Sequence, residues 1–243
     1  MAFTISRVAV FALVLALCAG AVRADDLADF NAAVERAASH NRVADGYLRT
    51  GNIDLASLEL DRLRESWAAL TQRFGGKRPE IFKDGTLYTT TLLKISTGLV
   101  GADMMLQSGR MEAARAALDG MRRDLYDLRK SAGVVVLADC IRDANAIADA
   151  IMVYNDRNLD WTNPDTGRGL AARSADYLKT LDRCDGIAAP DVRDSPEFRR
   201  LVDGARAGLG LIPKAIESKD ANLVHRVLIE LRSFDNLLAF RFG

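Results

Sequence analysis

The fold is decided by a pattern that is clearest in residues 47–56, which read YLRTGNIDLA. On both sides of Gly51, apolar residues recur at spacings of three and four, which is typical of helices that each bury one face. Glycine reaches backbone conformations that other residues avoid, so the chain is expected to reverse at Gly51. The stretch therefore predicts a hairpin of two antiparallel helices.

The same spacing continues along most of the chain. It predicts about eight helices, and no segment shows the sustained alternation of a β-strand. The predicted buried stripes cover residues 27–48, 53–74, 88–106, 111–128, 137–154, 170–184, 198–216 and 224–238. Gly208, Gly210 and Pro213 are expected to kink the seventh helix. We therefore expect an all-α protein built of antiparallel hairpins, arranged as a short solenoid or as stacked bundles.

A second turn repeats the pattern of the first. Residues 105–114, MLQSGRMEAA, align with residues 47–56, which places Gly109 58 positions after Gly51, and a fainter third copy has Lys219 at the glycine position. These turns resemble the inter-helix turn of tetratricopeptide repeats, in which a glycine permits the tight turn and an alanine permits close helix crossing. The resemblance covers two stretches of about 17 residues, and the offset is longer than the family's period of about 34. It implies a scaffold that binds partner proteins through a groove.

The composition is that of an average globular protein. The 243 residues include 33 Lys and Arg against 33 Asp and Glu, and 49% of them are hydrophobic. The zero net charge argues against a general nucleic-acid binder, and the hydrophobic content argues against disorder. The breaks at residues 75–79, 159–169 and 188–194 are too short to be flexible linkers. We therefore expect a single all-helical domain over residues 25–243.

Residues 1–24 are typical of a secretory signal peptide. Arg7 supplies the positive charge, residues 8–21 are uncharged and mostly apolar, and residues 22–24 offer small side chains before the expected cleavage site. A membrane anchor is the alternative, but an apolar run of about 14 residues is shorter than the roughly 20 that span a bilayer. A lipoprotein signal at Cys18 is a weaker alternative, because the residue before it is bulky. The mature protein is expected to be periplasmic or secreted and not to span a membrane.

After this cleavage two cysteines remain, Cys140 and Cys184, in an oxidising compartment. If the fifth and sixth predicted helices fold back on each other, residues equidistant from their turn face one another. The midpoint of the two cysteines is position 162, inside the turn-like segment 161–167. We expect a structural disulfide across this hairpin, and two separate buried thiols are the alternative.

The sequence offers few groups for catalysis or metal binding. Its two histidines, His40 and His225, are far apart and stand in no metal-binding motif. The sequence has no Cys-x-x-Cys-His, no Gly-x-Ser-x-Gly and no glycine-rich phosphate loop. We therefore predict no catalytic residue, no metal site and no cofactor.

One group of oxygen-bearing side chains is a weak candidate for calcium. Asp156, Asn158, Asp160 and Asp165 have the spacing of the start of a calcium loop. The positions that should hold a glycine and a bidentate glutamate hold other residues. The favoured interpretation is a polar turn with a helix cap at Asp165 or Thr166.

Other side chains are weak candidates for a ligand site in the helices. Asn41 lies on the first buried stripe and is expected to set helix register, while its neighbour His40 is expected to be half exposed; a small buried polar pair is the alternative. Methionines could bind copper in an exported protein, although core packing explains Met111 and Met121. A polar strip on the fifth predicted helix is interpreted as a solvated face. The methionines are Met104, Met105, Met111, Met121 and Met152, and the polar strip consists of Asp139, Asp143, Asn145 and Asp149.

The leading functional hypothesis is an exported, non-catalytic scaffold that binds a protein or peptide partner. It rests on the turn resemblance together with the missing catalytic motifs. A helical bundle that holds a small ligand or metal ion is the second hypothesis, because Asn41, His40 and the methionines could line its core. An enzyme is the third, since a site can be assembled from residues that share no local motif.

Overall fold

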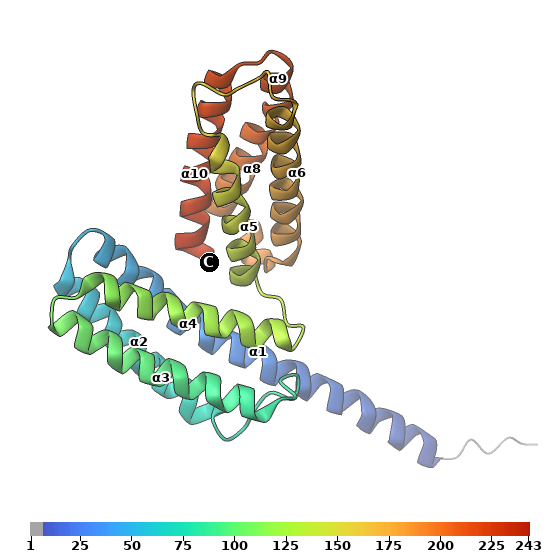
Figure 1. Cartoon of the computed structure of the whole chain (residues 1–243). Coiled ribbons are helices and arrows are strands. Elements are labelled where there is room, and N and C mark those ends of the chain that lie inside the picture. Colours follow the sequence, from blue (N-terminus) through green and yellow to red (C-terminus); the bar gives the residue numbers. More distant parts are fainter. Residues whose placement is uncertain (1–6) are drawn as a thin grey trace, which may run out of the picture. The chain divides into compact units, whose positions relative to one another are not determined.

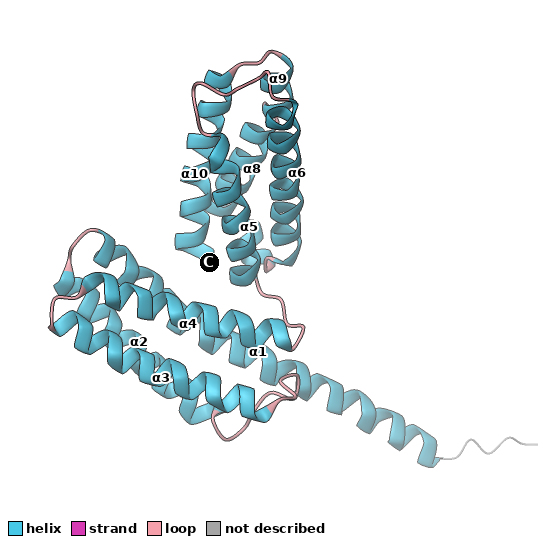
Figure 2. Ribbon diagram, in the orientation of Figure 1, coloured by secondary structure: helices cyan, strands magenta, loops and turns pink. Residues whose placement is uncertain are grey.

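The computed structural model describes residues 7–243, with side chains from residue 26 onward, so the predicted signal peptide lies outside the residues with described side chains. All regular elements of the described range are helices (Figures 1 and 2). They are α1 (Arg7–Arg49), α2 (Ile53–Phe74), α3 (Gly85–Gln107), α4 (Met111–Ser131), α5 (Leu137–Ile151), the 3₁₀ turn η1 (Met152–Tyr154), α6 (Pro164–Ile187), α7 (Pro190–Arg193), α8 (Pro196–Leu209), α9 (Ile212–Glu217) and α10 (Ala221–Phe242). The prediction of an all-α fold is confirmed.

The eight predicted helices correspond to the longer helices α1–α6, α8 and α10. The seventh predicted helix differs, because it is divided into α8 and α9 rather than kinked. Gly210 closes α8, and Pro213, which has no backbone N–H to donate, stands in the first turn of α9. Within residues 26–243, no helix has a stretch long and apolar enough to cross a membrane.

The chain divides into two compact units, unit 1 (Met1–Val134) and unit 2 (Val135–Gly243). Each unit has its own hydrophobic core, one built by α1–α4 and the other by α5, α6 and α8–α10. The sequence predicts one continuous domain, because the breaks at residues 75–79, 159–169 and 188–194 are too short to be flexible linkers. The two units are instead joined by the short connection at residues 132–136. Its length does not reveal that the buried residues on either side of it belong to different cores.

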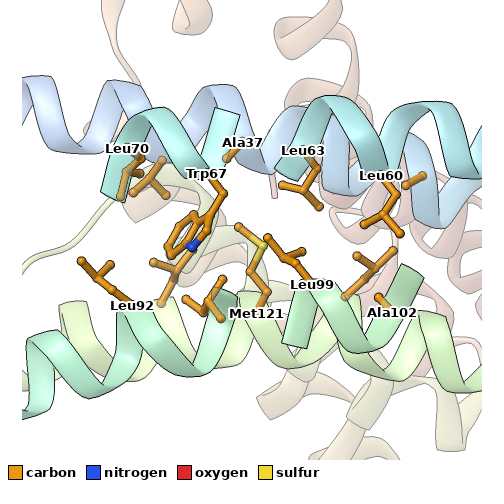
Figure 3. Packing of buried hydrophobic residues seen from close by; sticks show 14 of the residues in the cluster. Ala37, Leu60, Leu63, Trp67, Leu70, Leu92, Leu99, Ala102 and Met121 are labelled. Atoms are coloured by element: carbon orange, nitrogen blue, oxygen red, sulfur yellow. The ribbon is translucent and has the colours of Figure 1, made fainter. Parts of the chain in front are cut away.

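Unit 1 is a closed four-helix bundle. Helix α1 packs against α2 and α4, and α3 packs against the same two helices, so each helix has two neighbours. Figure 3 shows how Leu60, Trp67 and Leu70 of α2 face Leu92 and Leu99 of α3 across the core. This arrangement corresponds to the bundle alternative of the sequence prediction rather than to a solenoid, in which helices contact only sequential neighbours.

The three turns aligned in the sequence share one geometry. Gly51, Gly109 and Lys219 all have positive φ, at 76°, 71° and 53°. In each turn the next residue donates its backbone N–H to a carbonyl five residues back, as from Asn52 to Tyr47 at 2.9 Å. This is the Schellman motif, in which a left-handed residue closes a helix. The chain can therefore begin the next helix at once.

We expect Lys219→Gly to stabilise unit 2. Lys219 is the one described residue other than glycine with positive φ, and a side chain in this conformation costs about 1 kcal/mol relative to glycine. Urea unfolding should therefore show a gain of about 1 kcal/mol. The reverse change, Gly109→Lys, is the matched control in unit 1 and should lose a similar amount, because a Cβ there meets no atom within 4 Å and only the backbone is strained. A loss of stability in Lys219→Gly would contradict this account.

The second hairpins of the two units share their spacing of buried positions. Gly109 and Lys219 lie 110 positions apart, and buried residues on both sides of them follow the same offset. The buried pairs are Tyr88 and Phe198, Leu92 and Val202, Ile95 and Ala205, Leu99 and Leu209, Ala102 and Ile212, Leu118 and Leu228, Met121 and Leu231, and Leu128 and Leu238. The hairpins α3–α4 and α8–α10 are thus built on one pattern.

Candidate functional site

The predicted cysteine pair joins α5 to α6. The Sγ atoms of Cys140 and Cys184 are 2.19 Å apart, the Cα atoms are 5.4 Å apart, and both residues are buried. The disulfide lies within the core of unit 2, so it contributes to structure. In unit 1, Phe30 and Phe74 stand 110 positions earlier, and their rings meet edge to face at 5.5 Å. A covalent bond and an aromatic contact thus occupy corresponding places in the two units.

A buried carboxylate links three helices of unit 2. Asp235 of α10 accepts hydrogen bonds from the Asn145 amide of α5 at 2.6 Å and from the Tyr177 hydroxyl of α6 at 3.2 Å. Asp235 is buried, and this burial raises its pKa to about 6, although the Tyr177 and Asn145 hydrogen bonds and the Arg232 charge act in the opposite direction. Burial also raises the pKa of Tyr177, with a further contribution from the Asp235 charge. No substrate can touch Asp235 without opening the core, so the cluster is a structural one.

The polar strip on α5 is only partly the solvated face that the sequence suggests. Asp149 is exposed, but it accepts from Arg232 of α10 at 2.7 Å, and Asn145 points to buried Asp235. Asp143 accepts from Arg183 of α6 at 2.7 Å, and Asp139 is buried. These side chains join α5 to its neighbours, which the periodicity of one helix does not reveal.

The candidate calcium ligands are engaged with their own loop. Asp156 accepts from the backbone of Asn158, and Asp160 accepts from the backbone and hydroxyl of Thr162. The interpretation as a polar turn agrees with these contacts. The helix cap, however, is Asn163 rather than Asp165 or Thr166, because Pro164 occupies the first turn of α6.

The methionines of unit 1 and the two histidines differ in their surroundings. Met104 is exposed, Met105 and Met111 pack against the core of unit 1, and Met121 is buried in it. His225 pairs with Asn155 of the α5–α6 connection, its Nδ1 lying 2.7 Å from the amide oxygen. Among residues 26–243, no group of three or more His, Cys, Asp or Glu side chains is placed to hold a metal ion.

The neighbouring residues His40 and Asn41 of α1 do not pair with each other. His40 Nδ1 lies 2.7 Å from Glu59 Oε2 of α2, and the His40 side chain is 31% exposed, close to the half exposure expected from the sequence. Asn41 is buried and turns the other way, where its Nδ2 donates to the Leu118 carbonyl of α4 at 3.0 Å. Its Oδ1 is buried without a hydrogen-bond partner. A buried oxygen without a hydrogen bond lowers the free energy of unfolding by about 1–3 kcal/mol. Asn41 is therefore less favourable for stability than an apolar residue would be at this position of the stripe.

A charged cleft of about 280 Å³ lies between α1 and α4 above Asn41. Besides Asn41 and Ala116, it is lined by Asp45, Arg49, Glu112, Arg115, Asp119 and Arg122. Asp45 lies between two guanidinium groups, because it accepts from Arg49 at 2.8 Å and from Arg115 at 3.0 Å. Hydrogen bonds to Asp45 and then to Glu112 raise the pKa of Arg115 further above its usual range. The cleft therefore holds three positive and three negative side chains.

A larger groove of about 550 Å³ lies between α2 and α3. Its floor includes Trp67, whose indole Nε1 donates to the Ser96 hydroxyl at 2.9 Å, and Leu99. Its rim carries Asp61 and Glu65, and Arg64 there bonds Asp103 of α3 at 3.1 Å. The groove thus combines an apolar floor with a rim in which carboxylates outnumber guanidinium groups.

An apolar stripe runs along α3 beside this groove. Leu93, Val100 and Met104 are 66%, 51% and 58% exposed, and their spacing of seven and four residues places them on one face of the helix. The stripe extends about 16 Å along the helix axis. Val100 also lines the groove. The stripe and groove together form one surface, here called the α2–α3 surface.

Comparisons with known proteins identify no matching family model, no matching curated protein and no matching solved structure. The cleft between α1 and α4 and the α2–α3 surface of unit 1 are the candidate functional sites. The sequence prediction singled out Asn41 but missed Leu93 and Val100, which lie outside the predicted buried stripe. The signal was present, because three large apolar residues recur at helical spacing on the face of α3 opposite that stripe.

Proposed function

We propose that the protein is an exported scaffold that binds a partner protein or peptide at the α2–α3 surface. The observation that carries the proposal is the exposed stripe of Leu93, Val100 and Met104 next to a groove. Single exposed apolar side chains are common, but three in line beside a groove are typical of a site for a partner helix. The buried disulfide fits an oxidising compartment, in agreement with the proposed export to the periplasm or the medium.

The charges of the rim favour one class of partner. Asp61 and Asp103 form ion pairs with Arg64, and Glu65 also lines the groove, so three carboxylates lie near one guanidinium. An amphipathic helix with Lys or Arg beside its apolar face would pair its cations with these carboxylates and lay its apolar face on the stripe. We therefore propose a basic amphipathic helix as the partner segment. The proposed activity is binding and not catalysis.

Calorimetric titration with designed peptides tests this proposal. The probe is a helical peptide of about four turns with Leu at positions i, i+3, i+4 and i+7 and Lys elsewhere. A peptide with Glu in place of every Lys is the control. The Lys peptide should bind one site on unit 1, and the Glu peptide should bind at least about tenfold more weakly.

Matched variants locate the site. Val100→Lys places a charge in the apolar stripe and should weaken binding of the Lys peptide about tenfold or more. Leu58→Lys adds the same charge to unit 1 at a residue that is 47% exposed and lies outside the groove, so it should leave binding nearly unchanged. Equal losses in both variants would show that only net charge matters and would contradict the proposal.

A further inference from the structure

We infer that the cleft between α1 and α4 binds a small zwitterion of the α-amino acid class. This inference concerns a different face of unit 1 from the α2–α3 surface and does not depend on the proposed function. It rests on the unsatisfied oxygen of buried Asn41 and on the equal numbers of carboxylates and guanidinium groups that line the cleft.

The orientation of the Asn41 amide is fixed by its neighbours. Nδ2 donates to the Leu118 carbonyl at 3.0 Å and lies 3.4 Å from the sulfur of Met121. A reversed amide would place two acceptors, Oδ1 and the Leu118 carbonyl, against each other. Oδ1 is therefore the atom without a partner, in a residue only 1% exposed at the floor of the cleft. What it requires is an N–H or O–H donor.

The helices arrange the charged groups of the cleft in two facing rows. Asn41, Asp45 and Arg49 follow one another at intervals of four residues along one face of α1. Across the cleft, α4 presents Arg115 and Asp119, also four residues apart. The ion pair of Arg115 with Asp45 ties the rows together at 3.0 Å. The α1 row thus carries two acceptors, Asn41 and Asp45, and one cation, Arg49. The α4 row carries one cation and one carboxylate.

These charges select the class of ligand. A simple anion would be repelled by Asp45, Asp119 and Glu112 and could not donate to the Asn41 oxygen. A simple cation would be opposed by the three guanidinium groups. An α-amino acid satisfies both sets, because its ammonium can donate to Asn41 and the carboxylates while its carboxylate accepts from Arg49 or Arg115. The volume of about 280 Å³ suits a molecule of this size, and the exposed side chains at the rim can rotate to admit it.

Calorimetric titration of the folded chain with the common L-amino acids, one at a time, tests the inference. At least one should bind with one-to-one stoichiometry. The N,N,N-trimethyl form of the best binder keeps both charges but has no N–H, so it should bind about tenfold or more weakly. Its carboxamide, which lacks the negative charge, should weaken similarly. Absence of binding by every amino acid would overturn the inference, and so would equal binding of the trimethyl form.

Variants then assign binding to the cleft. Asn41→Leu should abolish binding while keeping the stripe of α1 apolar. Arg49→Gln removes one cation from a side chain that is 59% exposed, so the fold is retained and the affinity should fall about tenfold. Arg62→Gln is the control, because Arg62 is similarly exposed and lies outside the cleft. Unchanged binding in Arg49→Gln, or a loss in Arg62→Gln as large, would overturn the assignment.

Discussion

Replacement of both Cys140 and Cys184 by serine is expected to lower the free energy of unfolding of unit 2 by about 4 kcal/mol. The bond closes a loop whose ends are 44 residues apart, and opening that loop enlarges the unfolded ensemble. The Sγ atoms also belong to the buried core, so two serine hydroxyls would enter an apolar environment.

The two tryptophans of the chain allow the effect to be assigned to one unit. Trp161 belongs to unit 2 and Trp67 to unit 1, so emission from single-tryptophan variants reports each unit separately. In the Trp67→Phe background, urea unfolding followed by Trp161 should shift to lower urea when the cysteines are replaced. In the Trp161→Phe background the transition followed by Trp67 should stay in place. A shift of equal size in both would contradict the assignment of the disulfide to the unit 2 core.

Asp235→Ala is expected to destabilise unit 2 by about 3 kcal/mol. The change leaves the buried hydroxyl of Tyr177 and the amide of Asn145 without their acceptor, and it opens a small cavity between α5, α6 and α10. Chemical unfolding followed by Trp161 measures the loss. Asp149→Ala is the control, because Asp149 is exposed and its ion pair with Arg232 should contribute less than about 1 kcal/mol.

The ionisation of Asp235 should also make the stability of unit 2 depend on pH, with a stability that increases as the pH falls. Its pKa of about 6 lies above the usual value of an aspartate in an unfolded chain, so the folded state binds the proton more tightly. The contribution of this group to the free energy of unfolding therefore rises as the pH falls from 7 through 6. It reaches its full value near the unfolded pKa of about 4. Between pH 7 and pH 5 the gain should be about 1 kcal/mol. Asp235→Asn has no such proton to bind, and an identical pH profile in that variant would contradict the assignment.

The buried stripes could be predicted because helical periodicity is a local property. Leu60, Leu63 and Trp67 were expected inside and are buried, as are Leu228 and Leu231 at the other end of the chain. The cysteine pair could be predicted for a similar reason, since the two arms of a hairpin are in register about their turn. The residues that set both predictions lie within one helix or one hairpin.

Contacts between non-sequential helices could not be predicted in this way. Asp235 interrupts the stripe of α10 between Leu231 and Leu238, and its partners Asn145 and Tyr177 lie on two other helices. The sequence alone does not show that these helices meet there. The same holds for Asn41, which the sequence identified as an unusual residue, and for Asp45 and Arg115, which are 70 residues apart but share one ion pair.

The emission of Trp67 during titration with the basic amphipathic peptide reports directly on binding at the α2–α3 surface. In the Trp161→Phe protein, Trp67 is the remaining indole, and it lies in the floor of the α2–α3 groove bonded to Ser96. A peptide that docks there changes the surroundings of this ring. We predict a saturable change of Trp67 emission with one site, which the Glu peptide does not produce and which Val100→Lys weakens. An emission that does not change on addition of the Lys peptide, or that changes equally in Val100→Lys, would contradict binding at this surface.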